Sequence, residues 1–319
     1  MITETLHPKL AKVLENIDKV MIGKKKEAEL SIVALLAGGH VLIEDVPGVG
    51  KTMLVRSLAK SVDCQFKRIQ FTPDLLPSDV IGVSIYNPKE MEFEFRPGPI
   101  MGNIILADEI NRTSPKTQSA LLEGMEEKSV TIDGVTFPLK MPFFVMATQN
   151  PIEYEGTYPL PEAQLDRFLI KMKMGYPDYE EEIAVLTRSQ KGAPIDQIDA
   201  VISVDELLEL QKEVMNVIVD ETIKRYIVDL TRKTRENVNI YLGASPRASI
   251  ALMKAAQSYA FLHGRDYCIP DDVQYLAPYV LSHRIILKSE AKYEGMKEED
   301  MIQWILENTK VPIQRFVKG

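Results

Sequence analysis

Short apolar runs alternate with longer, more polar segments along the first half of the chain. These runs lie at Val41–Ile43, Phe66–Phe71, Ile104–Ala107, Phe143–Ala147 and Phe168–Met174. Apolar runs of this length predict buried strands, and the segments between them have room for helices or loops. Strands that alternate with helices form a largely parallel sheet with helices on both faces. The pattern therefore predicts an α/β fold.

Local signals predict the elements around these strands. Serine caps a helix, proline suits its first turn, and an Asp-Gly pair suits a hairpin turn. The predicted elements are helices at Pro8–Lys19 and Lys24–Ala37, a helix from Ser114-Pro115 to about Glu127, and hairpins at Val83–Arg96 and at Ser129–Leu139 around Asp133-Gly134.

From about Pro177 the strand signal fades and helical patterns replace it. Helices are predicted at Val204–Val217, Ile223–Arg235, Arg247–Leu262 and Pro270–Leu281. We therefore expect two domains, an αβα domain over residues 1–190 and a smaller all-helical domain over residues 200–319. Lys191–Asp199 is the predicted connector.

Composition narrows the class of protein. The chain has 319 residues, of which 45% are hydrophobic, enough for a sizeable core. Its net charge of −8 disfavours non-specific binding to nucleic acid, because a negative surface repels phosphates. Cys64 and Cys268 have neither a metal-like nor a disulfide-like spacing, and the chain has no signal-peptide pattern and no membrane-spanning stretch. We expect a cytoplasmic protein.

A phosphate-binding pattern follows the first predicted strand. Residues 45–52, Asp-Val-Pro-Gly-Val-Gly-Lys-Thr, come close to the pattern Gly-x-x-x-x-Gly-Lys-Ser/Thr. In such a loop backbone amides face the phosphates, Lys51 neutralises the β and γ oxygens, and Thr52 reaches Mg²⁺. Asp45 replaces the first glycine, so the backbone must enter the loop by another route, with help from Gly48. The alternative is an ordinary strand-to-helix turn with an exposed lysine.

The predicted nucleotide-binding residues of this segment are Gly48, Val49, Gly50, Lys51, Thr52 and Met53.

Two adjacent carboxylates, Asp108 and Glu109, end the apolar strand Ile104–Ala107. A buried strand should not end in two acids without a cation or partner nearby. Asp108 is placed to hold Mg²⁺ through its water shell, and Glu109 to orient and deprotonate an attacking water. A cap at the start of a helix is the alternative. The phosphate-binding lysine upstream favours an ATPase.

The chain resembles the MoxR family of AAA+ ATPases, in the helix-2-insert group. The resemblance is carried by Asp108-Glu109-Ile110-Asn111-Arg112 and Ala147-Thr148-Gln149-Asn150-Pro151, and it extends over nearly the whole chain. It implies an AAA+ P-loop αβα domain with a helical lid, ATP and Mg²⁺ as ligands, and a ring, expected to be a hexamer, with each site at a subunit interface. It also implies a protein client, often one with a von Willebrand factor A domain.

Two further residues receive roles from this resemblance. Asn150 would lie beside the catalytic water as sensor 1, although an asparagine that starts a turn is the alternative. Arg167, in Leu165–Phe168, resembles the arginine finger that reaches the neighbouring subunit's γ-phosphate. A guanidinium suits this role because it stays charged and donates in a planar fork. The alternative is a surface ion pair with Asp166 or Glu162.

Arg247, in the first turn of a predicted helix, resembles sensor 2 and would contact the bound nucleotide's phosphates from the lid. The helix dipole disfavours a cation there, so Arg247 needs an anionic partner, for which Asp271 or Asp272 is the alternative. Ile22 and Gly23 loosely match the segment that lines the adenine pocket. An ordinary turn between two helices is an equally good interpretation of that segment.

Three functions remain open. The favoured hypothesis is ATP-driven, chaperone-like remodelling of protein partners, with the two hairpins facing the ring channel, the client or only solvent. A DNA-processing motor is the second, although the charge of −8 disfavours it. The third is a scaffold that binds ATP without turnover. An ATPase subunit like that of magnesium chelatase is a closer enzyme alternative.

Overall fold

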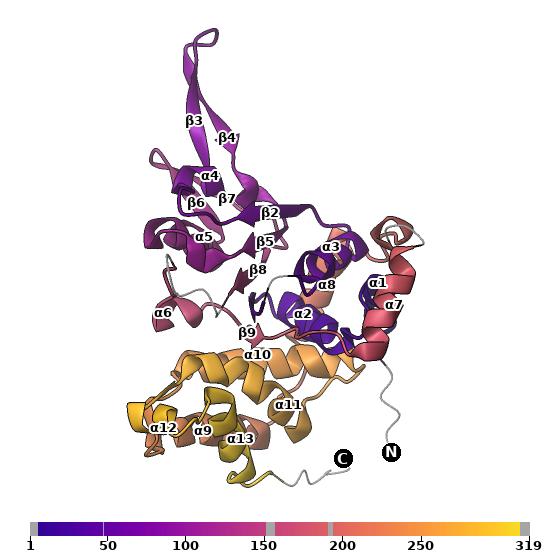
Figure 1. Cartoon of the computed structure of the whole chain (residues 1–319), viewed down its shortest axis with the longest axis vertical. Coiled ribbons are helices and arrows are strands. Elements are labelled where there is room, and N and C mark those ends of the chain that lie inside the picture. The colour runs from indigo at the N-terminus through magenta and orange to yellow at the C-terminus, as the bar shows by residue number, and fades with distance from the viewer. Residues whose placement is uncertain (1–5, 47, 151–156, 191–193, 313–319) are drawn as a thin grey trace.

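The central sheet has five parallel strands in the order β2-β5-β8-β1-β9 (Figure 1). The structure, a computed structural model, describes residues 6–46, 48–150, 157–190 and 194–312. The strands are β1 (Val41–Glu44), β2 (Phe66–Gln70), β5 (Ile104–Asp108), β8 (Phe144–Gln149) and β9 (Ile170–Met172). Each lies within or next to one of the predicted apolar runs. The predicted α/β fold with a parallel sheet is confirmed.

Helices cover both faces of this sheet. They are α1 (Pro8–Val20), α2 (Lys25–Leu36), α3 (Lys51–Ser61), α4 (Pro77–Ile81) and α5 (Pro115–Glu127). Successive strand residues point to opposite faces. Val41 and Ile43 therefore pack with α1, α2 and α3, whereas Leu42 packs with α4 and α5. Because both faces are buried, β1, β5 and β8 begin with consecutive apolar residues, whereas β2 at the edge of the sheet alternates.

Two hairpins extend from the sheet domain, as the turn signals predicted. One pairs β3 (Gly82–Asn87) with β4 (Glu92–Pro97), and the other pairs β6 (Ser129–Ile132) with β7 (Val135–Pro138). Phe95 of β4 stacks on Phe137 of β7 with ring centroids 4.2 Å apart, so the two hairpins contact each other. The β3–β4 hairpin projects far from the sheet (Figure 1).

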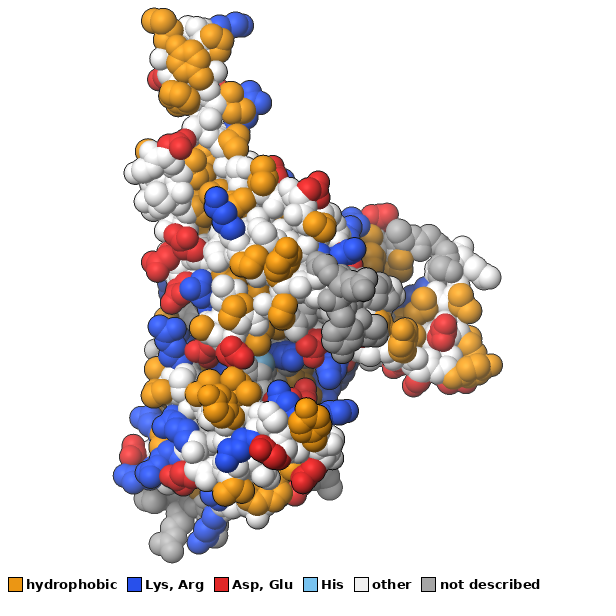
Figure 2. All heavy atoms as spheres, turned by 60° about the vertical axis from the view of Figure 1, so that its left-hand side comes forward, with side chains coloured by type: hydrophobic (Ala, Val, Ile, Leu, Met, Phe, Trp, Pro, Cys, Tyr) orange, Lys and Arg blue, Asp and Glu red, His pale blue; other side chains and the backbone are white. Residues whose placement is uncertain are grey.

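Apolar side chains gather at the tip of the β3–β4 hairpin (Figure 2). The exposed ones are Ile85, Tyr86, Met91 and Phe93, of which Phe93 is 72% exposed. Tyr86 and Phe93 lie opposite each other in the hairpin and their rings meet edge to face. The tip therefore presents an apolar surface that the described part of this chain leaves open to solvent.

The C-terminal part is mainly helical. Its elements are α8 (Val204–Val214), α9 (Glu221–Glu236), β10 (Ile240–Leu242), α10 (Pro246–Leu262), α11 (Pro270–Leu281), η4 (Ser282–Arg284), β11 (Ile286–Leu287), α12 (Ser289–Tyr293) and α13 (Glu298–Glu307). From α9 onward this part lies beneath the sheet in Figure 1, whereas its first helix, α8, lies beside α3. The sequence predicted four of the helices but neither α12 and α13 nor the short β10–β11 pair. One predicted helix of this part, α8, also contacts the sheet domain, since Gln211 donates to the Leu35 carbonyl at 2.6 Å.

Short elements complete the described chain. They are η1 (Pro99–Met101), η2 (Ile110–Arg112), α6 (Glu162–Leu165), α7 (Tyr179–Ser189) and η3 (Pro194–Gln197). Residues 191–193 of the predicted connector lie outside the described residues, and η3 occupies part of the rest. The domain boundaries stay a prediction. Among the described helices, none combines the length and apolar character that a membrane span requires.

His40 is a buried polar residue at the start of β1. Its Nδ1 accepts a hydrogen bond from the Val145 amide at 3.1 Å, and its Nε2 faces the Met125 carbonyl at 3.3 Å. A neutral ring with the proton on Nε2 satisfies both contacts. Burial lowers the pKa of His40 from 6.5 to about 4. The folded chain thus keeps this ring neutral where an unfolded chain would protonate it.

This histidine should make the fold less stable in mild acid. Between about pH 6.5 and pH 4 the unfolded state binds the extra proton, so stability falls as the pH is lowered through that range. The shift corresponds to about 3 kcal/mol at its full extent. Urea unfolding at several pH values should show a steeper loss for the parent than for His40→Gln. An equal pH dependence of stability in the two proteins would contradict a neutral His40 ring in the folded state.

Candidate functional site

The predicted phosphate-binding loop lies between β1 and α3. Gly48 and Gly50 have φ of 88° and 89°, a left-handed conformation that glycine adopts without strain. Gly50 caps α3, so Lys51 and Thr52 form the first turn of that helix. The positive end of the helix dipole and its free amides therefore lie where the sequence predicts a phosphate. Pro47, in the same motif, lies outside the described residues.

Asp45 begins the loop with a side chain where the usual pattern has none. Its carboxylate accepts hydrogen bonds from the amides of Met174 and Gly175, at 2.7 and 2.6 Å. Its backbone is not left-handed, and the left-handed turn comes at Gly48 instead. Lys24 donates to the Met174 carbonyl at 2.7 Å and secures the same segment. Asp45 thus joins the loop to the chain that follows β9.

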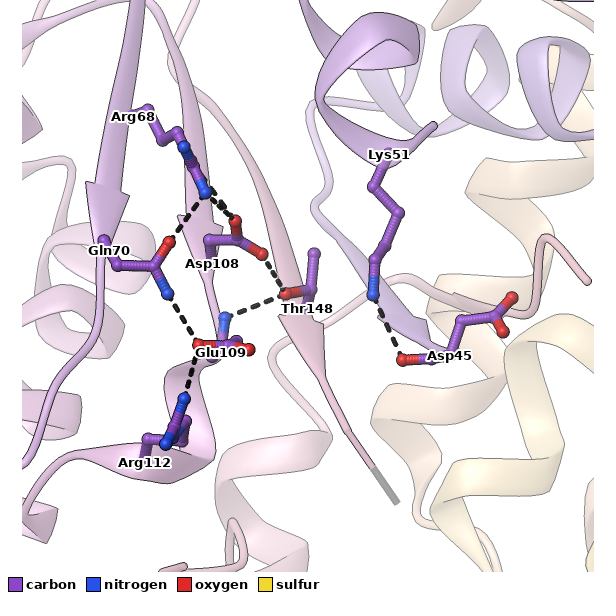
Figure 3. Close-up of polar contacts among 8 residues, drawn as sticks. All are labelled: Asp45, Lys51, Arg68, Gln70, Asp108, Glu109, Arg112 and Thr148. Atoms are coloured by element: carbon purple, nitrogen blue, oxygen red, sulfur yellow. Dashed lines mark hydrogen bonds and ion pairs between the residues drawn. The ribbon is translucent and has the colours of Figure 1, made fainter. Parts of the chain in front are cut away.

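Asp108 and Glu109 lie at the carboxyl end of β5, where each has charged or polar partners (Figure 3). Arg68 and the Thr148 hydroxyl donate to the two oxygens of Asp108, at 2.6 and 2.7 Å. Glu109 has φ of 58°, which is uncommon for a residue other than glycine. Strained backbone of this kind clusters at functional sites.

The carboxylate of Glu109 is held from two sides. Gln70 donates to Glu109 Oε2 at 2.7 Å and Arg112 donates to the same oxygen at 3.1 Å, while the Glu109 amide donates to the Thr148 hydroxyl at 2.8 Å (Figure 3). Thr148 therefore binds both members of the acidic pair. Contacts within the chain thus orient the Glu109 carboxylate without a bound substrate.

A pocket of about 500 Å³ joins the loop to the acidic pair. It is lined by Asp45, Gly48, Gly50, Lys51, Thr52, Met53, Arg68, Gln70, Asp108, Glu109, Thr148 and Asn150. The structure thus brings together, in one pocket, five of the six residues predicted from the phosphate-binding segment, both carboxylates and Asn150, whereas the sixth, Val49, is buried in the core. Burial lowers the pKa of Lys51, while the negative charges of Asp108, Asp45 and Glu109 oppose that shift. Lys51 Nζ donates to the Asp45 carbonyl at 3.1 Å.

The segment predicted to line an adenine pocket borders the same loop. A Cβ on Gly50 would lie 3.0 Å from the Met21 methyl, so the turn that contains Ile22 and Gly23 packs against it. Gly23 has φ of 68°, and a Cβ there would lie 1.8 Å from a Glu181 oxygen. The left-handed backbone favours glycine at this position, and an added Cβ would also displace the end of the Glu181 side chain. The role of this turn in binding adenine stays a prediction.

Arg167 and Arg247 meet at a different surface. Both face Glu126 near the end of α5, with Arg167 at 2.9 Å and Arg247 at 3.9 Å from its oxygens. Two of the four alternative partners named from the sequence are occupied otherwise, because Asp166 pairs with Arg284 and Asp272 pairs with Arg265, each at 2.6 Å. The two arginines thus lie together, apart from the residues that line the pocket.

Four residues at these sites were missed by the sequence analysis, namely Arg68, Gln70, Thr148 and Glu126. Arg68 and Gln70 flank the buried Ile69 in a run taken as apolar, and this alternation was the available signal. Their importance depends on strand pairing, since β2 places Gln70 opposite Asp108. Glu126 carried no local signal, because it is one of several exposed acids on α5.

Comparisons with known proteins agree with this architecture. Residues 40–170 match the model of the ATPase family associated with various cellular activities (AAA), and residues 232–305 match the AAA lid domain. The chain is 44% identical to Chaperone MoxR1 of Mycobacterium tuberculosis over 312 residues, which cover 95% of this chain and 82% of that one. The chain belongs to the MoxR family of AAA+ ATPases.

Other relatives of this MoxR protein cover its whole length. The protein named YeaC of Bacillus subtilis is 65% identical over 312 residues, 98% of each chain. A crystal structure from Cytophaga hutchinsonii superposes with a TM-score of 0.90 at 44% identity, covering 96% of this chain and 95% of that one. The αβα domain followed by a lid is therefore shared with a solved relative.

From the contacts of Asp45 we predict that replacing it lowers the stability of the fold. Asp45→Gly restores the usual motif but leaves the amides of Met174 and Gly175 without their acceptor. Such loss costs about 1–3 kcal/mol for a buried donor. Urea unfolding should show both Asp45→Gly and Asp45→Ala less stable than the parent, with the alanine variant separating the lost carboxylate from added backbone freedom. An Asp45→Gly protein as stable as the parent would refute this role.

Proposed function

We propose that this MoxR protein binds ATP with Mg²⁺ and hydrolyses it at sites shared by neighbouring subunits of a ring. The observation that carries the proposal is the single pocket in which Lys51, Thr52, Asp108, Glu109 and Asn150 meet. Each of these residues suits one task. Lys51 binds phosphate oxygens, Asn150 positions water, and Glu109 is the base that takes its proton.

The donor set of the pocket suits Mg²⁺. This ion binds one or two carboxylates and substrate phosphates while it keeps several waters. The Thr52 hydroxyl and the Asp108 carboxylate supply such oxygens at the phosphate end of the pocket. When bound, Mg²⁺ neutralises negative charge on the phosphates. Arg68, which now donates to Asp108, balances the charge of that carboxylate within the chain itself.

The placement of Arg167 and Arg247 supports a shared site. The two guanidinium groups lie together at Glu126 and not among the residues that line the pocket of their own chain. We therefore assign both arginines to the nucleotide of a neighbouring subunit. For Arg247, contact with phosphates from the lid stays a prediction, and we propose that the phosphates are those of the neighbour's nucleotide. A hexameric ring is the assembly we propose, because AAA+ sites of this kind require a neighbour.

The proposed biological role is chaperone-like remodelling of a protein client, such as one with a von Willebrand factor A domain. The relative from Mycobacterium tuberculosis carries the name Chaperone MoxR1. The apolar tip of the β3–β4 hairpin offers a surface that suits a protein better than a phosphate backbone (Figure 2). A net charge of −8 argues in the same direction, against a DNA-processing motor.

Two variants separate binding from hydrolysis. Glu109→Gln keeps the shape of the side chain but removes the base, so ATP should bind and persist without turnover. Lys51→Ala removes the positive charge that faces the phosphates, so ATP affinity itself should fall. Calorimetry and phosphate release measure the two effects. Turnover at the parental rate in Glu109→Gln would show that Glu109 is not the base.

A mixing experiment tests the shared site. Arg167→Ala chains should bind ATP yet hydrolyse it about 1000-fold more slowly, as for loss of an arginine finger. Mixed with Lys51→Ala chains, they should regain hydrolysis, because some interfaces then combine an intact Lys51 with an intact Arg167. Subunit exchange is verified with labelled chains. If exchange occurs and both proteins stay inactive, the site is not shared.

A further inference from the structure

The turn that carries Arg167 is held by a side chain from the lid. Arg284 of η4 is only 4% exposed, and its guanidinium donates to Asp166 Oδ1 at 2.6 Å. It also donates to the backbone carbonyls of Asp166, Phe168 and Leu169, at 3.1, 2.7 and 3.2 Å. These four acceptors lie on both sides of Arg167. Arg284 therefore holds the chain on both sides of that position, and the neighbouring His283 of the lid also faces the Phe168 carbonyl at 2.9 Å.

Such a contact differs from a surface ion pair. An arginine has five N–H donors in a rigid fork, so it can satisfy several buried carbonyl groups at once. A buried carbonyl that loses its donor costs free energy. The contacts of Arg284 therefore favour one position of the lid relative to the turn. Phe168 is fully buried beside Arg167, and this fixes the turn further. A shift of the lid would consequently shift Arg167.

The side chain of Arg167 contacts the sheet domain, in contrast to the backbone of its turn, which contacts the lid. Its guanidinium pairs with Glu126 of α5 at 2.9 Å, and Arg247 of the lid faces the same carboxylate. The backbone of the turn thus depends on the lid through Arg284, while the end of the side chain meets the sheet domain. Together these contacts make the direction of Arg167 sensitive to how the lid sits on the sheet domain.

We infer that Arg284 is a positioning residue for hydrolysis. It ties the Arg167 turn to the lid, so that the lid of one subunit controls how Arg167 is presented to the nucleotide of the next. This inference rests on the proposed shared site and adds to it a route between subunits. It predicts that Arg284 acts on the neighbour's site and not on the site of its own chain.

The mixing experiment can test whether Arg284 acts on the site of the neighbouring subunit. In the mixture, the Lys51→Ala chain supplies Arg167, and the Arg167→Ala chain supplies the nucleotide site. Arg284→Gln is introduced into one of the two chains at a time. In the chain that supplies Arg167 it should lower the recovered hydrolysis about 10- to 100-fold, because small misplacement of a catalytic group is costly. In the chain that supplies the site it should leave hydrolysis unchanged.

A matched control is available within the lid. Arg265 forms a buried pair with Asp272 at 2.6 Å and also donates to the Tyr267 carbonyl, both within the lid. Arg265→Gln breaks an ion pair of the same kind and should show no preference for either chain. Asp166→Asn is a milder variant of the Arg284 contact if Arg284→Gln does not fold. It should show the same chain preference as Arg284→Gln, with a smaller loss.

The outcomes separate the inference from the proposed function. Equal losses with Arg284→Gln in either chain, or no loss in both, would overturn the positioning role while the shared site stands. Absence of recovered hydrolysis in the original mixture, with subunit exchange verified, would instead overturn the shared site itself. Loss only in the chain that supplies Arg167, with unchanged ATP affinity of its partner's site, supports the inference.

Discussion

The parallel hydrogen bonding of β5 between β2 and β8 places the polar residues that end these strands at one edge of the sheet. Gln70 lies opposite Asp108, and Ala107 lies opposite Ala147. One residue further along β8, the Thr148 hydroxyl donates to the Asp108 carboxylate and accepts from the Glu109 amide. A change of register by a single residue would turn these side chains to the other face. The site therefore depends first on strand pairing.

Charge balance is the second feature that unites the site. Asp108 is paired with Arg68, and Glu109 is paired with Arg112. Lys51 has three carboxylates in its vicinity, which oppose the effect of its burial. Groups of opposite charge held at short range in a partly buried pocket interact more strongly than they would in water. The chain thus keeps its reactive charges oriented by its own residues.

The structure divides the predicted chemistry between two surfaces. The pocket around Lys51 gathers the predicted phosphate-binding lysine and the acidic pair, whereas Arg167 and Arg247 meet at Glu126 and are not among the residues that line that pocket. In the proposed ring, the second surface of one subunit would meet the pocket of the next. Arg284 of the lid donates to the Arg167 turn, so it joins the lid to the second surface.

The sequence alone determined the structural features that depend on residues close together along the chain. The apolar runs predicted the strands, Ser114-Pro115 predicted the start of α5, and Asp133-Gly134 predicted the turn of the β6–β7 hairpin, where φ is 51° and 80°. Motif spacing likewise selected Lys51 and the acidic pair. In each of these cases the physical cause is a cap, a turn preference or a periodicity that acts within a few residues.

Only the tertiary structure decided which distant residues meet. Asp45 contacts residues about 130 positions away, and Arg284 contacts Asp166 over a separation of 118. Glu126 gains its role because Arg167 and Arg247 converge on it from the turn before β9 and from α10. A single sequence holds no local signal for such pairs, since strand register and the packing of the lid set them. Sequence motifs predicted most residues of the pocket, whereas the contacts among these residues depended on the fold.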